Sequence, residues 1–243
     1  MSTNQSGNAR NAAEDKLRQE FNRWADDGRG EEMERHHISI AEQTIAAMEL
    51  HPGERVLDLS CGAGWATRLL ARAVEGFGVD GHEGSALGLD ISDEMIAHAR
   101  AAARDVENAM FVRSSAEQIP WRDDYFDKVL SIEAFYYFPD QEAVLRELLR
   151  VIVPGGKVFI LINLYRENPY SLRWADALNV PVHARSEQEY LDMVLSCGFR
   201  IVEARRIPDH TPTPETYSGK WFANAKELQE FKRIGALLLI ATK

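Results

Sequence analysis

The sequence predicts an α/β fold in which a mainly parallel sheet is covered by helices on both faces. Short apolar runs alternate with segments whose apolar residues follow helical spacing, a pattern typical of βαβ units. The first apolar run leads through a Gly-x-Gly turn into a helical segment, as in nucleotide-binding α/β proteins. The predicted strands centre on Val56, Gly88, Phe111, Val129, Phe159, Val202 and Leu238.

The first predicted strand and its turn are the most informative part of the chain. Residues 55–65 read R-V-L-D-L-S-C-G-A-G-W, a branched apolar strand that contains Asp58 and runs into Gly62 and Gly64. The glycines permit a tight turn and a close approach of ligand to backbone. Apolar residues on helical spacing follow from Trp65, so free N–H groups of a helix N-terminus would face that ligand. A strand-to-helix turn without a ligand is the alternative.

The second apolar run, residues 86–92, ends in a carboxylate, Asp90. In a βαβ unit an acid at this strand tip accepts the hydroxyl groups of an adenosine ribose, so Asp90 is predicted to bind ribose. Ser92 is the predicted N-cap of the following helix. The glycine-rich residues 75–85 make the distance from the turn longer than in the usual dinucleotide fingerprint, and we expect a surface loop there.

Further blocks carry a family resemblance over about residues 50–207. Residues 58–64, D-L-S-C-G-A-G, resemble the motif D-x-G-x-G-x-G of the class I S-adenosylmethionine-dependent methyltransferases, and Asp90 resembles their ribose-binding acid. The resemblance is closest to the small-molecule group of methyltransferase domain 11, which includes quinone methyltransferases. The other matching blocks are 114–121 (adenine-framing segment), 125–132 (fourth strand), 133–140 (active-site loop), 145–158 (helix, proline-glycine-glycine turn and fifth strand) and 186–199 (last crossover helix).

The resemblance implies a Rossmann-like seven-stranded sheet with an antiparallel last strand, an N-terminal helical lid, and S-adenosyl-L-methionine as cofactor. Ser60 replaces the first glycine of the motif, and Ser115 stands where many relatives carry an aspartate that accepts from the adenine amino group. A serine accepts that bond more weakly. The implied cofactor-binding residues are Phe21, Trp24, Asp58, Ser60, Gly62, Gly64, Asp90, Ile91, Ser115, Ala116, Glu117 and Ile132.

Phe21 and Trp24 occupy the place where the family often has Tyr-Asp-x-x-Ala over the cofactor, although helix packing explains them as well. The catalytic candidates are Glu133 and Tyr136, because a general base helps when the methyl acceptor carries a proton. Glu133 could instead only line the cofactor, and Tyr136 and Tyr137 could be wall aromatics. His36 and His37 are further candidates, in a charged run that is usually a solvated helix face.

The substrate wall is expected in residues 163–179, after the fifth strand, where this superfamily usually inserts its substrate cover. Ordinary packing of an excursion helix is the alternative explanation of its aromatic residues. The wall candidates are Tyr165, Tyr170, Leu172 and Trp174, with Arg166 and Arg173 available for a substrate carboxylate.

Length and composition predict one enzyme domain. We expect residues 1–13 to be disordered and residues 14–243 to form a single domain, with a helical lid (14–50, broken at 26–30), a cofactor-binding half (51–164) and a substrate-side half (165–243). Lys and Arg number 28 against 38 Asp and Glu, a net charge of −10, which disfavours nucleic acid as a partner.

Two cysteines, the lack of a signal peptide and the lack of a long apolar span predict a cytoplasmic protein with no membrane span. No metal site is expected, and the chain should be a monomer or homodimer. The favoured function is in-line methyl transfer to a small, partly apolar or aromatic metabolite. The alternatives are an inactive S-adenosylmethionine-binding partner protein and an NAD enzyme, the latter disfavoured because Thr67 stands at the third glycine position.

Overall fold

A seven-stranded sheet organises the molecule, in the order β3-β2-β1-β4-β5-β7-β6. The computed structural model describes the backbone of residues 3–243 and the side chains of residues 12–243. β7 runs antiparallel to β5 and β6, and the other neighbouring strands are parallel, as predicted. Each predicted centre lies within its strand: β1 Arg55–Leu59, β2 Ser85–Asp90, β3 Ala109–Arg113, β4 Phe126–Ile132, β5 Ile152–Ile162, β6 Ile201–Ile207 and β7 Ala236–Thr242.

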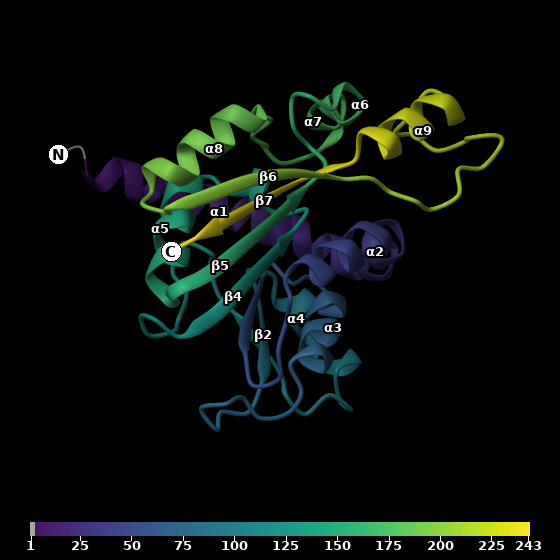
Figure 1. Ribbon diagram of the computed structural model, residues 1–243. Coiled ribbons are helices and arrows are strands. Elements are labelled where there is room, and N and C mark those ends of the chain that lie inside the picture. Colours follow the sequence, from purple (N-terminus) through teal and green to yellow (C-terminus); the bar gives the residue numbers. More distant parts are fainter. Residues whose placement is uncertain (1–2) are drawn as a thin grey trace.

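Helices cover both faces of this sheet, and Figure 1 shows α2, α3 and α4 on one side and α5 and α8 on the other. The burial of β1 reflects this layering, since Val56 packs with α2 and α3 while Leu57 belongs to the cluster that contains α5 and α8. The helices are α1 Thr3–Asp26, α2 Arg29–Ala47, α3 Trp65–Ala73, α4 Asp93–Ala102, α5 Gln141–Val151, α6 Pro169–Leu172, α7 Trp174–Ala177, α8 Glu187–Ser196 and α9 Ala225–Ile234, with a 3-10 turn η1 at Phe135–Tyr137.

The strand order creates a crevice between β1 and β4. From β1 the chain proceeds outward to β2 and β3, and then returns to the other side of β1 to form β4 and β5. At the carboxyl ends of β1 and β4 the chain therefore leaves in opposite directions. Open α/β sheets bind their ligands in the crevice at such a point.

Two stretches confirm the expected loops. No helix or strand lies between α3 and β2, where a single bridge joins Phe77 and Glu83, and residues 208–224 connect β6 to α9 without regular structure. The proline-glycine-glycine turn, by contrast, lies inside β5 and not before it. The ladder pairs Phe126 with Ile152 and next Lys128 with Lys157, so residues 153–156 bulge out of the pairing.

The N-terminal segment forms two helices that part at Gly28, whose φ is 72°, within the predicted break. α1 begins at Thr3, inside the segment 1–13 for which disorder was expected, while residues 1 and 2 lie outside the described part. Extending an existing helix adds one hydrogen bond per residue fixed, which explains how a polar segment continues a docked helix.

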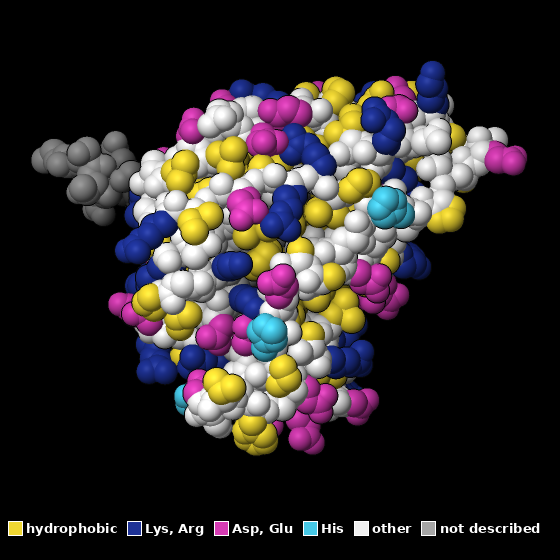
Figure 2. Space-filling model, viewed as in Figure 1, with side chains coloured by type: hydrophobic (Ala, Val, Ile, Leu, Met, Phe, Trp, Pro, Cys, Tyr) yellow, Lys and Arg dark blue, Asp and Glu magenta, His cyan; other side chains and the backbone are white. Residues whose placement is uncertain are grey.

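The surface shown in Figure 2 mixes Lys and Arg with Asp and Glu side chains, in keeping with the excess of acidic residues. Within the described residues, none of the helices combines the length and apolarity needed to cross a membrane.

Candidate functional site

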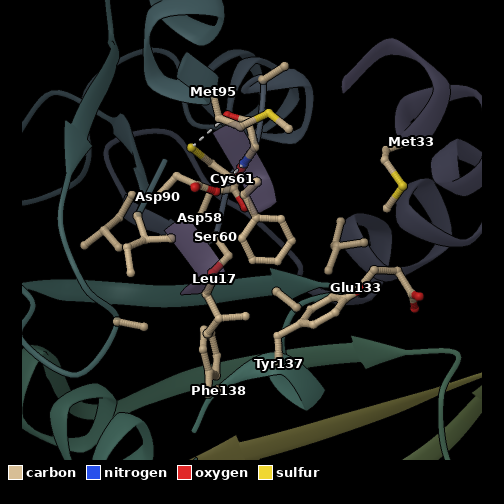
Figure 3. Close-up of a pocket in the computed structure, with 18 of the residues that line it drawn as sticks. Leu17, Met33, Asp58, Ser60, Cys61, Asp90, Met95, Glu133, Tyr137 and Phe138 are labelled. Carbon is tan, nitrogen blue, oxygen red and sulfur yellow. Dashed lines mark hydrogen bonds between the residues drawn. The ribbon is translucent and has the colours of Figure 1, made fainter. Parts of the chain in front are cut away.

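A cavity lies at the carboxyl ends of β1, β2 and β4, with α1 and α2 on its outer side. Figure 3 shows Asp58 and Asp90 on one side of it and Glu133 and Met33 on the other. The sheet contributes the turn after β1, the tip of β2, the segment after β3 and the loop after β4. The cavity therefore occupies the crevice that the strand order predicts.

The turn after β1 uses a backbone conformation that favours glycine. The φ angles are 61° at Ser60, 52° at Gly62 and 75° at Gly64. Ser60 therefore adopts the left-handed conformation although it carries a Cβ, which is uncommon for residues other than glycine. A Cβ on Gly62 would have Met95 Sδ as its nearest contact, at 4.0 Å, so this face of the turn is open.

Gly64 has a different role from the predicted one. It does not line the cavity, and a Cβ there would lie 2.5 Å from Phe111 Cε1 and 2.8 Å from the Cβ of Ala99. The lack of a side chain at Gly64 lets α3 begin close to β3 and α4. Of the two glycines predicted to bind cofactor, only Gly62 faces the cavity.

Asp58 is a buried acid at the end of β1. It is 2% exposed, and Thr67 Oγ1 donates to its Oδ2 at 2.6 Å. Burial raises the pKa of Asp58 to about 7, in spite of this hydrogen bond, and the neighbouring charge of Asp90 adds to the shift. Thr67 stands where a dinucleotide-binding turn has its third glycine. In this chain its side chain has a structural role, because it donates a hydrogen bond to Asp58.

Asp90, at the tip of β2, holds two backbone segments. Its Oδ2 accepts from the N–H of Gly62 and its Oδ1 from the N–H of Ser92, both at 2.9 Å. Burial raises the pKa of Asp90 although these bonds oppose the shift. A carboxylate offers about four acceptor sites, so the two oxygens retain acceptor capacity toward the cavity. Ser92 caps α4 as predicted, accepting from Met95 N at 3.0 Å.

Aromatic side chains form the wall contributed by α1. Phe21, Trp24 and Tyr137 all line the cavity and pack edge to face, with ring centroids 5.2 to 6.2 Å apart. The indole N–H of Trp24 donates to Glu20 Oε1 at 2.8 Å. Phe21 and Trp24 therefore pack against another part of the chain and line the cavity at once.

Glu133 forms the opposite end of the cavity and is strongly constrained. It is 5% exposed with a φ of 54°, and its carboxylate accepts from the Tyr136 hydroxyl at 3.0 Å and from the Asn163 N–H at 2.6 Å. Burial raises the pKa of Glu133 to about 7 despite these bonds. A carboxyl group with this pKa gains or loses a proton near neutral pH.

His37 lies 3.9 Å from Glu133, measured between Nε2 and Oε2, and lines the same cavity. Its Nδ1 is 2.8 Å from the carbonyl oxygen of Met33, which places the proton of the neutral ring on Nδ1 and a lone pair on Nε2. Burial lowers the pKa of His37 to about 4. The neighbouring Arg35 and His36 are exposed, so of the two candidate histidines only His37 lines the cavity.

The sequence comparisons agree with this geometry. A family model for the methyltransferase domain, Methyltransf_11, matches residues 57–160. The phthiotriol/phenolphthiotriol dimycocerosates methyltransferase of Mycobacterium tuberculosis is 30% identical over 201 residues, which cover 82% of this chain and 71% of that protein. This chain belongs to the class I S-adenosylmethionine-dependent methyltransferases.

Two further relatives support this assignment. The 2-phytyl-1,4-naphtoquinone methyltransferase of Synechococcus elongatus is 33% identical over 156 residues, covering 59% of this chain and 64% of that protein. A solved complex between the Haloferax volcanii Trm112 methyltransferase activator and a methyltransferase contains a chain that is 32% identical, with a TM-score of 0.83, over 92% of this chain and 97% of that one.

The structure places most of the predicted site residues of this methyltransferase around one cavity. Tyr136, one of the two catalytic candidates, is buried outside the lining, and its hydroxyl donates to Glu133. In the described part of the chain, no group of three or more His, Cys, Asp or Glu residues could hold a metal ion. The predicted residues that do line the cavity are Phe21, Trp24, Asp58, Ser60, Gly62, Asp90, Ile91, Ser115, Ala116, Glu117, Ile132 and Glu133.

The predicted substrate wall after β5 does not line this cavity, whose lining residues all fall between Glu14 and Pro139. Tyr165 is fully buried and donates to the Gly235 carbonyl at 2.8 Å. Trp174 packs against an aromatic group on the β6–α9 connection and α9, which includes Phe231 at 5.2 Å.

The other wall candidates, Tyr170 and Leu172, are also absent from the lining. Arg166 pairs with Glu189 at 2.8 Å and Arg173 with Glu227 at 3.0 Å, so both guanidinium groups already have carboxylate partners. The aromatic and basic residues of this segment thus pack and pair with the C-terminal part of the chain.

Several lining residues were missed by the sequence analysis. They lie on α1, α2 and α4 and in the turn after β1, and include Glu14, Leu17, Met33, Cys61 and Met95. A usable signal existed for α1, because positions 14, 17, 21 and 24 follow helical spacing and so share one face of the helix.

Gly64→Ala should destabilise the fold, whereas Gly62→Ala should cost much less. At Gly64 the new Cβ adds overpacking against Phe111 and Ala99 to the positive φ, and together these should cost about 2 to 4 kcal/mol. At Gly62 only the conformational cost of about 1 kcal/mol applies. Urea unfolding of both variants measures the difference, and equal losses would contradict the assigned packing role.

Glu133→Gln should change how stability depends on pH. Because the pKa of Glu133 is about 7 in the folded chain and near 4.5 when unfolded, its contribution lowers stability as pH rises between these values. That loss, on the order of 3 kcal/mol at most, should vanish in Glu133→Gln. Unfolding at pH 5 and pH 8 tests this, with the exposed Glu142→Gln as control. Parallel profiles for parent and Glu133→Gln would show that the carboxyl group ionises normally.

Proposed function

We propose that this methyltransferase binds S-adenosyl-L-methionine across the carboxyl ends of β1, β2 and β4 and transfers its methyl group to a small, partly apolar or aromatic metabolite. One observation carries the proposal. The glycine turn and Asp90 open into the same cavity whose other end is Glu133 and the aromatic wall. A nucleoside end and a reaction end therefore share one enclosed space.

The residues present fit this cofactor. The open face at Gly62 leaves room where a side chain would otherwise project, and the held carboxylate of Asp90 offers acceptors for ribose hydroxyls. Ser115, Ala116 and Glu117 line the end expected for adenine. The cofactor would supply a methyl group that is already activated by its sulfonium centre, so the chain mainly has to position and enclose the reactants.

The lining supports an apolar or aromatic methyl acceptor. Phe21, Tyr137, Phe138 and Met33 give the cavity a largely apolar wall beside Glu133. The relatives named for phthiotriol dimycocerosates and for 2-phytyl-1,4-naphtoquinone point to the same chemical class. We propose that aromatic contacts orient the acceptor ring or chain in this part of the cavity.

Glu133 is the group proposed to take a proton from an acceptor hydroxyl when one must be removed. Its pKa of about 7 suits that role, and the Tyr136 hydroxyl and the Asn163 N–H hold the carboxylate in place. Tyr136 is thus a positioning residue. The rate should depend more on alignment and exclusion of water than on this proton transfer.

We also propose that this methyltransferase associates with an activator protein of the Trm112 type. The solved relative in such a complex is similar along nearly its whole length. Co-expression with a Trm112 protein followed by size-exclusion chromatography tests this second proposal. A stable joint peak with raised methyl transfer is expected, and separate elution would contradict it.

Transfer of labelled methyl groups to any acceptor would exclude the alternative function, that of an inactive partner protein that binds S-adenosylmethionine.

Asp90→Asn should weaken cofactor binding about 10- to 100-fold, because a neutral amide replaces a charge-assisted acceptor of two hydroxyl groups. Calorimetry with S-adenosylhomocysteine measures the change. Asp80→Asn, in the exposed loop before β2, is the matched control and should bind like the parent. Unchanged affinity in Asp90→Asn would refute the ribose assignment.

α1 and α2 should exchange amide hydrogens more slowly when S-adenosylhomocysteine is bound. Both helices contribute side chains to the cavity and meet at Gly28, so a ligand beneath them should stabilise their docked arrangement. Hydrogen exchange read by mass spectrometry tests this, with α8 as an internal reference. Equal protection of α1 with and without ligand would make the pair a fixed part of the fold.

A further inference from the structure

One face of α1 lies along the cavity. Glu14, Leu17, Phe21 and Trp24 all line it, at successive spacings of three, four and three residues. Three of these side chains are apolar or aromatic, as expected for a helix face that packs on a domain. Glu14 alone brings a charge to the same face, and it does so at the end of the cavity where Ser115 lies.

Glu14 and Ser115 are joined by a hydrogen bond in which the Ser115 hydroxyl donates to Glu14 Oε1. The same hydroxyl oxygen accepts from the Glu117 N–H at 3.1 Å. A serine hydroxyl has one proton and two lone pairs, so these two bonds use its proton and one lone pair. Ser115 therefore has one lone pair left to accept a hydrogen bond from a ligand.

Glu14 has more acceptor capacity than Ser115. A carboxylate accepts about four hydrogen bonds, and the Ser115 hydroxyl accounts for one of them. α1 is also held in this position by two other contacts, since Arg18 pairs with Asp93 at 3.3 Å and Asn22 Oδ1 accepts from the Ser92 hydroxyl at 2.6 Å. The Glu14 carboxylate is thus placed at the cavity by the docking of the whole helix.

We propose that the Glu14 carboxylate accepts a hydrogen bond from the exocyclic amino group of adenine, in place of an acid at position 115 in the segment after β3. This inference rests on the proposed binding of S-adenosylmethionine. The exocyclic amino group donates hydrogen bonds, and a carboxylate forms a stronger bond with it than a hydroxyl oxygen does. Ser115 then acts through Glu14, as a positioning residue that orients its carboxylate. The adenine specificity of this methyltransferase is supplied by its N-terminal helix.

The test compares two ligands that differ at this amino group, S-adenosylhomocysteine and S-inosylhomocysteine, in which a carbonyl replaces it. Calorimetry is carried out on the full chain and on Glu14→Ala, with Asp15→Ala as the matched control. Asp15 is exposed on the same helix and pairs with Arg18. Glu14→Ala should bind the adenosyl ligand about 10- to 100-fold more weakly and the inosyl ligand nearly as the parent does.

A second variant separates recognition from helix docking. In Glu14→Ala/Ser115→Asp the carboxylate is moved from α1 to the segment after β3, and preference for the adenosyl ligand should return. Equal weakening of both ligands in Glu14→Ala would mean that Glu14 only docks α1, and an unchanged preference would overturn the inference. If the parent binds neither ligand, the proposed function itself fails. If the parent binds the adenosyl ligand and Glu14→Ala keeps its preference, only the inference fails.

Discussion

The hydrogen bond from the Gly62 N–H to Asp90 is the contact on which the arrangement of the site depends. It joins the turn after β1 to the tip of β2, and the other oxygen of the same carboxylate holds the Ser92 N–H at the start of α4. Two strand ends and one helix start are thereby fixed by a single side chain. The positive φ angles at Ser60 and Gly62 are the backbone conformations that let the turn reach this acceptor.

This arrangement places two acids, Asp58 and Asp90, in a buried environment that disfavours their charged forms. Burial raises the pKa of both. Hydrogen-bond donors oppose that shift, and Thr67 and two backbone N–H groups supply some of them from the protein. A ligand that brings hydroxyl groups to Asp90 would add further donors and stabilise its charge. The same carboxylate is then both the fixed point of the turn and a group whose ionisation favours ligand binding.

The fold could be predicted from the sequence because its signals are local. Most strands contain a short apolar run, and the turn after β1 and the break at Gly28 have glycine or serine at positions of positive φ. These features therefore follow from patterns of a few residues. The role of Gly64 could not be predicted this way. A motif shows that glycine is needed, but whether a ligand or Phe111 occupies the space depends on how β3 and α4 pack.

The substrate wall predicted at Tyr165 and Trp174 does not line the cavity, and the reason is related. Aromatic residues bury themselves against whichever apolar surface is nearest, and for Trp174 that surface is Phe231 and its neighbours on the C-terminal part of the chain, 57 positions further along. Pairing at this distance leaves no local pattern. Glu14 was missed for the opposite reason, since its helical spacing was visible but the contact with Ser115, 101 residues away, was not.

The contribution of α1 has a consequence for how the site is completed. The sheet alone supplies the turn, the two acids and Glu133, whereas Phe21, Trp24 and Glu14 come from a helix that precedes the first strand. α1 is held by buried side chains such as Leu17 and Ala25, which belong to the main core cluster. Its ion pair between Arg18 and Asp93 is partly exposed, and exposed ion pairs stabilise little. A ligand that bridges the sheet and this helix would add its own contacts to those that already hold the helix in place. Under the proposed function, binding the nucleoside and enclosing the reacting groups would be two results of the same docking of α1 on the sheet.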